Sequence, residues 1–159
     1  MENKAYKELL NENKLIISKI CRAYSNDSAE FEDYFQEVAI QLWKAYNNYK
    51  GEAKISTWVY RISLNVCLTQ VRKKNRQIVT SSLNLAYDHI SEEDIAGQDQ
   101  LDKLYDAIRS LKKMDRAIIL LYLEEKKYKE MAEILGINIS NIGVKVNRIK
   151  KELKEKLNG

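Results

Sequence analysis

The amino-acid sequence predicts an all-α protein: two small helical domains joined by a flexible acidic linker, the C-terminal domain being a four-helix unit with a helix-turn-helix. The 159 residues include no proline and five glycines, which disfavours turn-rich sheet architectures. Apolar residues recur at helical spacing along most of the chain. A content of 45% hydrophobic and 31% charged residues is enough for one moderate core or two small ones.

Charge is unevenly distributed, although the net charge is only +4. Residues 1–76 carry 13 Lys/Arg against 9 Asp/Glu, residues 77–100 carry none against 5, and residues 101–159 carry 14 against 9. We therefore predict a first domain over residues 1–76, a linker over 77–100 and a second domain over 101–159. Acidic Glu92, Glu93 and Asp94 lie in the linker.

Composition excludes several classes of protein. Cys21 and Cys67 lie in apolar helical stretches without metal-ligand spacing, so we expect no disulfide, no metal and no cofactor. No apolar run approaches the ~20 residues that span a bilayer, and the polar N-terminus does not resemble a signal peptide. We expect a cytoplasmic protein without membrane insertion.

The first clear helix begins at a capping box formed by Asp27 and Glu30. Its apolar stripe has the full helical period and consists of Phe31, Tyr34, Phe35, Val38, Ala39, Leu42, Trp43 and Tyr46. Asp33, Gln36 and Glu37 share the outer face. Because no Lys or Arg occurs between Ala23 and Trp43, this face suits a basic protein partner better than DNA. The alternative is an ordinary solvated acidic face.

The next helix follows Gly51 and is expected to be capped by Ser56 or Thr57. Its predicted apolar face is Ile55, Val59, Ile62 and Val66, and its opposite face is Arg61, Asn65, Leu68 and Arg72. Six basic residues and no acidic residue lie between Lys54 and Arg76, together with Trp58 and Tyr60. Cations beside aromatic rings are typical of single-stranded nucleic-acid binding, although the aromatic residues are equally compatible with a place in the core.

The second domain begins with Leu101, Leu104, Ile108 and Leu111 and continues through the apolar run 118–123. Its last two helices are predicted to form a helix-turn-helix, in which Ala132 allows close approach, Gly136 takes a left-handed conformation and Asn138 caps the second helix. The buried face of that second helix is predicted to be Ile142, Val146, Ile149 and Leu153.

The opposite face of the last helix carries residue types that contact DNA. It displays Asn141, Val144, Arg148 and Lys151, flanked by Lys145 and Asn147. Asn and Arg make bidentate contacts with adenine and guanine edges, and Lys suits phosphates. An ordinary helical hairpin with a solvated basic face is the alternative. Gly143, unfavourable inside a helix, either permits close approach to DNA or is tolerated.

The chain resembles the bacterial RNA polymerase sigma factors of the extracytoplasmic-function (ECF) group of the sigma-70 family. The resemblance covers nearly the whole chain and rests on three stretches: residues 33–43, residues 49–65 and residues 128–137. It implies a promoter-specificity subunit that recognises −10 and −35 promoter elements and stabilises the melted −10 strand. The implied partners are core RNA polymerase, promoter DNA and an anti-sigma factor.

The resemblance also implies roles for individual residues. Asp33, Gln36 and Glu37 would dock on the clamp helices of the largest polymerase subunit, while the C-terminal domain would contact the flap region. The −10 element would be contacted by Lys50, Gly51, Glu52, Ala53, Lys54, Trp58, Tyr60, Arg61, Asn65 and Arg72. The −35 element would be contacted by Asn141, Val144, Lys145, Asn147, Arg148 and Lys151. Ile55, Gly143 and Val144 depart from the residues common in the family.

Two other functions compete with this interpretation. A free-standing helix-turn-helix transcription regulator would bind duplex DNA without polymerase, which leaves the first domain without a purpose. An enzyme is the third class, because Asp33 and Glu37 at i, i+4 are able to hold Mg²⁺. With a single histidine, His89, and no phosphate-binding glycine loop, the sequence offers little for catalysis, and we expect a protein that is not an enzyme.

Overall fold

The structure, a computed structural model, describes residues 2–77 and 98–158 of the chain. Those residues form α-helices and no strand, so the all-α prediction is confirmed. The chain divides into two compact units, Met1–Asp88 and His89–Gly159. In order, the helices are α1 Glu2–Glu12, α2 Lys14–Tyr24, α3 Ser28–Tyr46, α4 Ile55–Gln77, α5 Gln98–Arg109, α6 Lys113–Leu123, α7 Tyr128–Leu135 and α8 Ile139–Asn158.

Part of the predicted organisation lies outside the described residues. The acidic linker residues Glu92, Glu93 and Asp94 and the single histidine fall in the range 78–97. The sequence boundary between the two units, after residue 88, falls in the same range. The predicted domain limits at residues 76 and 101 therefore stay predictions. Helix α5 begins at Gln98, three residues before Leu101, where the second domain was predicted to begin.

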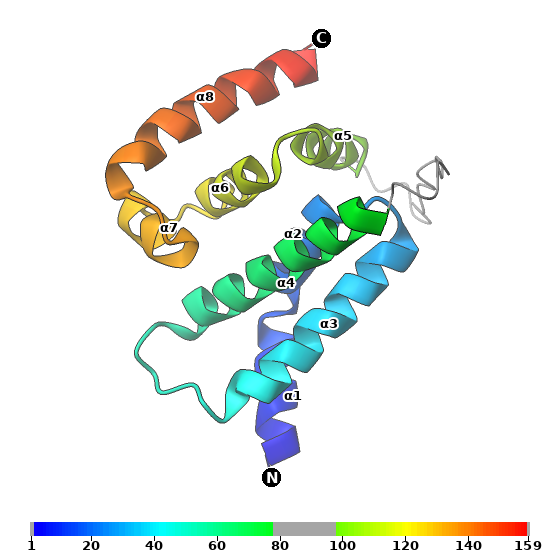
Figure 1. The fold of residues 1–159 in the computed structure, drawn as a ribbon, viewed down its shortest axis with the longest axis vertical. Helices are drawn as coiled ribbons and strands as arrows, with labels where there is room; N and C mark the ends of the chain where they lie inside the picture. Colours follow the sequence, from blue (N-terminus) through cyan, green and yellow to red (C-terminus); the bar gives the residue numbers. More distant parts are fainter. Residues whose placement is uncertain (1, 78–97, 159) are drawn as a thin grey trace. The chain divides into compact units, whose positions relative to one another are not determined.

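In the first unit, α2, α3 and α4 pack against one another and α1 packs against α2 and α3 (Figure 1). The predicted capping box at the start of α3 is confirmed in a modified form. The Asp27 carboxylate accepts a hydrogen bond from the Glu30 N–H at 2.8 Å. The Glu30 carboxylate accepts a hydrogen bond from the Asn26 N–H, also at 2.8 Å, rather than from the Asp27 N–H.

Only part of the apolar stripe predicted for α3 is buried in the core of the first unit. Tyr34, Val38 and Leu42 are buried, whereas Trp43, predicted to be a core residue, is 42% exposed. The side of the stripe that α2 and α4 leave uncovered meets α1, since Tyr6 packs edge-on against Trp43 with ring centroids 5.0 Å apart. The Tyr6 hydroxyl also donates a hydrogen bond to the Ala39 carbonyl. Helix α1 thus completes this side of the unit.

Helix α4 starts earlier than predicted. The Lys54 carbonyl accepts the Trp58 N–H at 3.0 Å, so the helix begins at Ile55 and neither Ser56 nor Thr57 is its cap. Ile55 is 42% exposed because it lies at the first position of the helix, whereas Val59 is fully buried. Of the apolar face predicted for α4, Val59 and Val66 are buried, Ile62 is half-buried and Ile55 is exposed.

Cys21 of α2 and Cys67 of α4 lie side by side in the core, as free thiols with their Sγ atoms 4.0 Å apart. The hydrogen bond from the Cys67 thiol to Cys21, together with burial, raises the pKa of Cys67 well above its ordinary value. The unfolded chain therefore loses this proton at a lower pH than the folded chain. The Cys67 contribution to stability should accordingly be lost as the pH rises above the ordinary thiol range, about 8.5.

Thiol labelling tests this environment. At pH 8 we expect a water-soluble disulfide reagent to modify Cys21 and Cys67 about a hundredfold more slowly in the folded protein than in urea, because only opened molecules expose the thiolates. The reaction is followed by absorbance of the released chromophore. Labelling of either thiol at the same rate in both states would contradict the buried pair.

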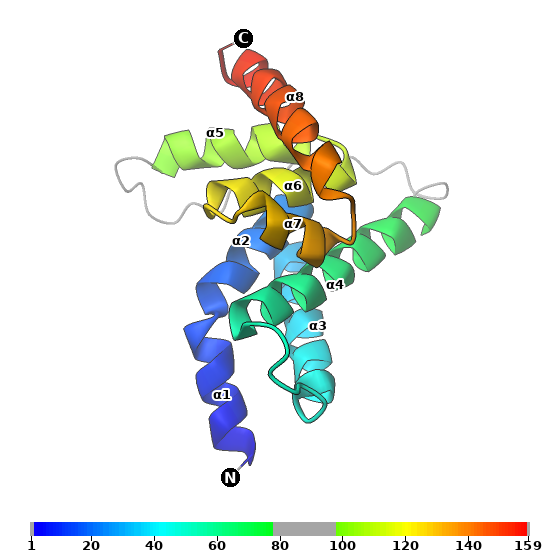
Figure 2. The same ribbon diagram turned by 90° about the vertical axis from the view of Figure 1, so that its left-hand side faces the viewer.

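In the second unit, α8 packs against each of α5, α6 and α7. Its four predicted core residues are all buried, as is the apolar run of α6 from Ala117 to Leu121. Leu101 and Leu123, predicted within apolar runs, are 42% and 49% exposed because they lie near helix ends. Figure 2 shows the short turn through which α7 leads into α8. Across both described ranges, every helix is too short or too polar to span a bilayer.

Candidate functional site

The outer face of α3 presents the acidic residues as predicted. Asp33 and Gln36 are exposed and Glu37 is half-buried. The Glu37 carboxylate accepts a hydrogen bond from Gln41 Nε2 at 2.9 Å, one helical turn further along. These side chains leave a polar, acidic row on a helix whose opposite face is held in the core.

Two apolar side chains beside this row were not singled out from the sequence as surface residues. Ile40 is 46% exposed and Trp43 is 42% exposed. With Asp33 and Glu37, Ile40 continues one helical face at i, i+4 and i+7. Helical periodicity placed Trp43 in the core stripe and Ile40 just outside it. No sequence signal distinguishes an exposed apolar residue from one that another helix covers. The face thus combines acidic groups with exposed apolar surface.

Figure 1 shows the loop that joins α3 to α4. Two aromatic residues, Tyr49 and Trp58, hold it in shape. Tyr49 packs against Trp58 of α4 with ring centroids 5.0 Å apart, and its hydroxyl donates a hydrogen bond to the Ala53 carbonyl. Gly51 turns the chain with φ of 76°, in the left-handed region that glycine tolerates. Around this turn Lys50, Gly51, Glu52 and Lys54 are exposed and Ala53 is half-buried.

Helix α4 carries most of the predicted nucleic-acid residues on its surface, with one exception. Asn65 and Arg72 are exposed, and Arg61 is half-buried. Tyr60 is only 2% exposed, because it follows Val59 toward the core, so its predicted place in a DNA contact was wrong. Trp58 is half-buried against Tyr49, which makes it a support for the loop as well as a surface residue.

A groove of about 410 Å³ runs between α3 and α4. Glu37 and Gln41 line it from α3, while Asn65 and Lys73 line it from α4. The structure therefore brings the end of the acidic row close to the basic helix within one unit. Across this unit an ion pair joins Lys74 of α4 to Glu30 of α3, which helps to hold the two oppositely charged helices together.

The helix-turn-helix of the second unit has the predicted turn. Gly136 has φ of 69°, and its N–H donates to the Ala132 carbonyl at 2.8 Å. The Asn138 side chain accepts a hydrogen bond from the Ser140 N–H at 3.4 Å, near the start of α8. On the outward side of α8, Asn141, Val144, Asn147, Arg148 and Lys151 are exposed, and Lys145 is half-buried.

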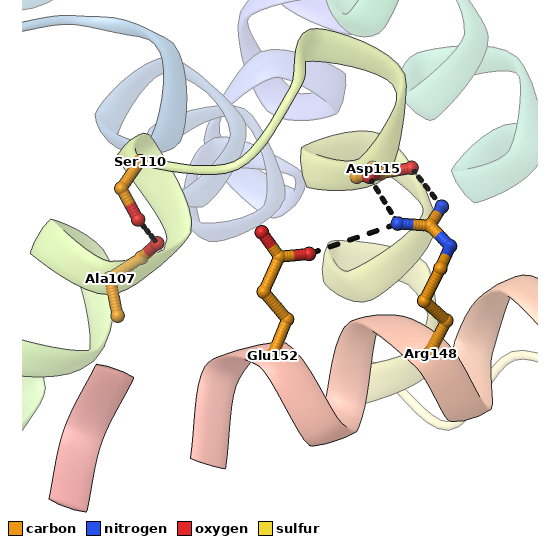
Figure 3. A network of polar contacts seen from close by, with 5 residues as sticks. All are labelled: Ala107, Ser110, Asp115, Arg148 and Glu152. Atoms are coloured by element: carbon orange, nitrogen blue, oxygen red, sulfur yellow. Dashed lines mark hydrogen bonds and ion pairs between the residues drawn. The ribbon is translucent and has the colours of Figure 1, made fainter. Parts of the chain in front are cut away.

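Arg148 differs from its neighbours because its guanidinium is already engaged (Figure 3). Two of its nitrogens donate to the two carboxylate oxygens of Asp115 on α6, at 3.1 and 3.2 Å. Glu152 lies 3.7 Å from the same guanidinium. The hydrogen bonds and charge of Asp115 raise the pKa of Arg148. The sequence did not indicate Asp115, which is 5% exposed, because nothing local marks an acidic residue as a partner of one 33 positions later.

Gly143 lies on the α7 side of α8. A Cβ atom built at this position would lie 3.4 Å from Cε2 of Tyr128, an ordinary van der Waals distance. The glycine therefore sits against an aromatic ring of the unit itself. Both alternatives given for Gly143 stay predictions.

The two glycines of this motif should respond oppositely to alanine. Gly136→Ala should lower the free energy of unfolding by about 1 kcal/mol, because the left-handed conformation opposes a Cβ. Gly143→Ala should raise it by about 0.5–1 kcal/mol, because alanine favours the helix and has room. Urea denaturation followed by circular dichroism measures both. Equal effects of the two substitutions would contradict the left-handed conformation of Gly136 and the helical conformation of Gly143.

Two helical units, one with a helix-turn-helix and the other with an acidic helix packed against a basic one, are typical of DNA-binding transcription proteins. Comparison with known families gives the specific family. The model of sigma-70 region 2 matches residues 9–77, and that of sigma-70 region 4 matches residues 101–153. The chain belongs to the sigma-70 family of RNA polymerase sigma factors, in the ECF group. Members of this family are regulatory subunits that give RNA polymerase its promoter specificity.

Individual relatives span both units. The chain is 24% identical to the ECF RNA polymerase sigma factor SigW of Bacillus subtilis, over 96% of this chain and 89% of that protein. It is 26% identical to SigE of Mycolicibacterium smegmatis over 96% of this chain, which spans 62% of that relative. Its fold is similar to that of the sigma factor RpoE co-crystallised with the anti-sigma factor NepR from Bartonella quintana, with a TM-score of 0.77, 22% identity and 98% coverage of both chains.

Proposed function

We propose that this protein binds core RNA polymerase and directs it to promoters by recognising a −10 element with its first unit and a −35 element with its second. The proposal rests above all on the separation of charge between α3 and α4. No basic residue occurs between Ala23 and Trp43, and no acidic residue between Lys54 and Arg76, yet the two helices pack side by side. One unit therefore offers a face that repels DNA beside a face that attracts it.

The α3 face is the proposed polymerase docking site. Asp33, Gln36 and Glu37 would meet the clamp helices of the largest subunit, and the exposed Ile40 and Trp43 supply apolar area beside them. Charges at the edge of such an interface steer association and select the partner, whereas buried apolar side chains contribute more of the affinity. The mixture of acidic and apolar groups fits a protein surface better than it fits nucleic acid.

The loop and α4 are the proposed site for the melted −10 strand. The packing of Tyr49 on Trp58 and the Tyr49–Ala53 hydrogen bond hold Lys50, Glu52 and Lys54 on the outside of a defined turn. A preformed turn of this kind would hold these side chains ready for a base that has been extruded from the stack. Arg61, Asn65 and Arg72 on α4 would contact the adjoining DNA. Tyr60 is left out of this surface because its side chain is buried.

The second unit is the proposed −35 site. In a helix-turn-helix the N-terminal part of the second helix contacts base edges in the major groove, and this position is occupied by Asn141, Val144 and Lys145 of α8. Lys151 lies further along the helix, where a lysine suits the phosphate backbone. We also propose that this unit contacts the polymerase flap and that an anti-sigma factor sequesters the protein, as NepR binds RpoE in the similar structure.

A DNA-binding assay with and without core polymerase tests the proposal against a free-standing regulator. Duplexes randomised in sequence are offered to the purified protein, to core polymerase and to the two together. The expected result is sequence-selective retention only when both are present. Tight selective binding by the protein alone, unaffected by polymerase, would favour the free-standing helix-turn-helix regulator.

A further inference from the structure

Val144 is the most exposed of the large apolar residues of α8. It is 72% exposed, against 48% for Ile139 and 46% for Leu157, which lie near the two ends of the helix. Single exposed apolar residues are common on proteins, so the position of Val144 matters more than its exposure. It lies in the second turn of α8, three residues after Asn141, on the face that a recognition helix turns toward base edges.

Arg148, another residue of this face that could contact a base, has its guanidinium already bound. Arg148 would need its two-pronged guanidinium to recognise guanine O6 and N7, but the same fork is bound to both carboxylate oxygens of Asp115. Because Asp115 is only 5% exposed, releasing Arg148 would leave a buried carboxylate without its cation. Arg148 therefore fixes α8 to α6.

We propose that Val144 contacts the C5-methyl group of a thymine in the −35 element; the inference rests on the −35 assignment made above. In the major groove the thymine methyl is the apolar group that base edges present to a side chain. Asn141, one turn earlier on the same face, has the amide that pairs with adenine N6 and N7. Asn141 and Val144 thus both match A·T pairs, and the guanidinium of Arg148, bound to Asp115, adds no preference for guanine.

Removal of single methyl groups from DNA tests the contact. The holoenzyme, made from the full chain and core polymerase, selects duplexes from a library randomised over the upstream element. The best sequence is then remade with deoxyuridine in place of each thymine in turn, which removes only the C5-methyl. At one position the substitution should weaken binding by the wild-type holoenzyme about fourfold, the contribution of one buried methyl group.

The variant Val144→Ala should bind thymine and uracil equally at that position. It is expected to fold, because Val144 is exposed and alanine favours the helix. The matched control is Leu157→Ala, which also shortens an exposed apolar residue of α8 and should keep the fourfold preference. Equal binding of thymine and uracil at every position, or retention of the preference by Val144→Ala, overturns the contact but leaves the promoter assignment standing. Failure of the wild-type holoenzyme to select any sequence overturns both.

Discussion

Asp33→Arg should weaken binding of the protein to core RNA polymerase by about a hundredfold, roughly 3 kcal/mol. The substitution places a positive charge in the acidic row of α3, where a basic partner surface would then meet a like charge. Because Asp33 is exposed and arginine has the higher helix propensity, the fold should persist. Binding is measured by fluorescence anisotropy of labelled protein titrated with core polymerase.

The control for this experiment is Glu12→Arg, which makes the same change of charge at an exposed position of α1. It should bind polymerase within about twofold of the wild type, since isolated surface charges contribute little. Circular dichroism should show the same helix content for both variants. Full-strength binding of the Asp33→Arg protein would remove the α3 face from the polymerase interface.

Ile149→Ala should destabilise the second unit by about 2–5 kcal/mol. Ile149 is fully buried on α8, the helix that packs against each of the other three in this unit, so truncation leaves a cavity where several helices meet. A small domain has little stability in reserve, and we expect loss of −35-dependent transcription at physiological temperature. Urea denaturation followed by circular dichroism measures the change.

The two tryptophans, Trp43 and Trp58, provide an internal control because both lie in the first unit. Their fluorescence should report the unfolding of the first unit, and its urea midpoint should be the same in Ile149→Ala as in the wild type. Lys154→Ala, an exposed change on the same helix, should alter stability by less than about 0.5 kcal/mol. A fluorescence transition that shifts together with the circular-dichroism transition would show that the units unfold as one.

Much of the fold was predictable because helix periodicity and backbone chemistry are local. The capping residues Asp27 and Glu30, the left-handed Gly136 and the buried face of α8 all follow from spacing and residue type, and the structure confirms them. The start of α4 was missed because Ser56 and Thr57 are good caps in isolation, while the chain enters the helix earlier, at Ile55.

The surface was harder to predict, because exposure depends on which other helix covers a residue. Tyr60 belongs to the core although the family resemblance implied a DNA contact, and Trp43 is 42% exposed although the apolar stripe of its helix predicted a core residue. The Asp115–Arg148 pair joins residues far apart in the sequence, so only the packing of α6 against α8 brings them together. For the same reason, the sequence identified Arg148 as a DNA contact without indicating that its guanidinium is already bound.

Run-off transcription with purified components tests the central proposal most directly. Core RNA polymerase is incubated with fragmented genomic DNA of the source bacterium, with and without this protein, and the 5′ ends of the transcripts are sequenced. We predict a set of new start sites that appear only with the protein and share two upstream elements at fixed spacing. Identical start sites with and without the protein, while it binds DNA by itself, would contradict the account.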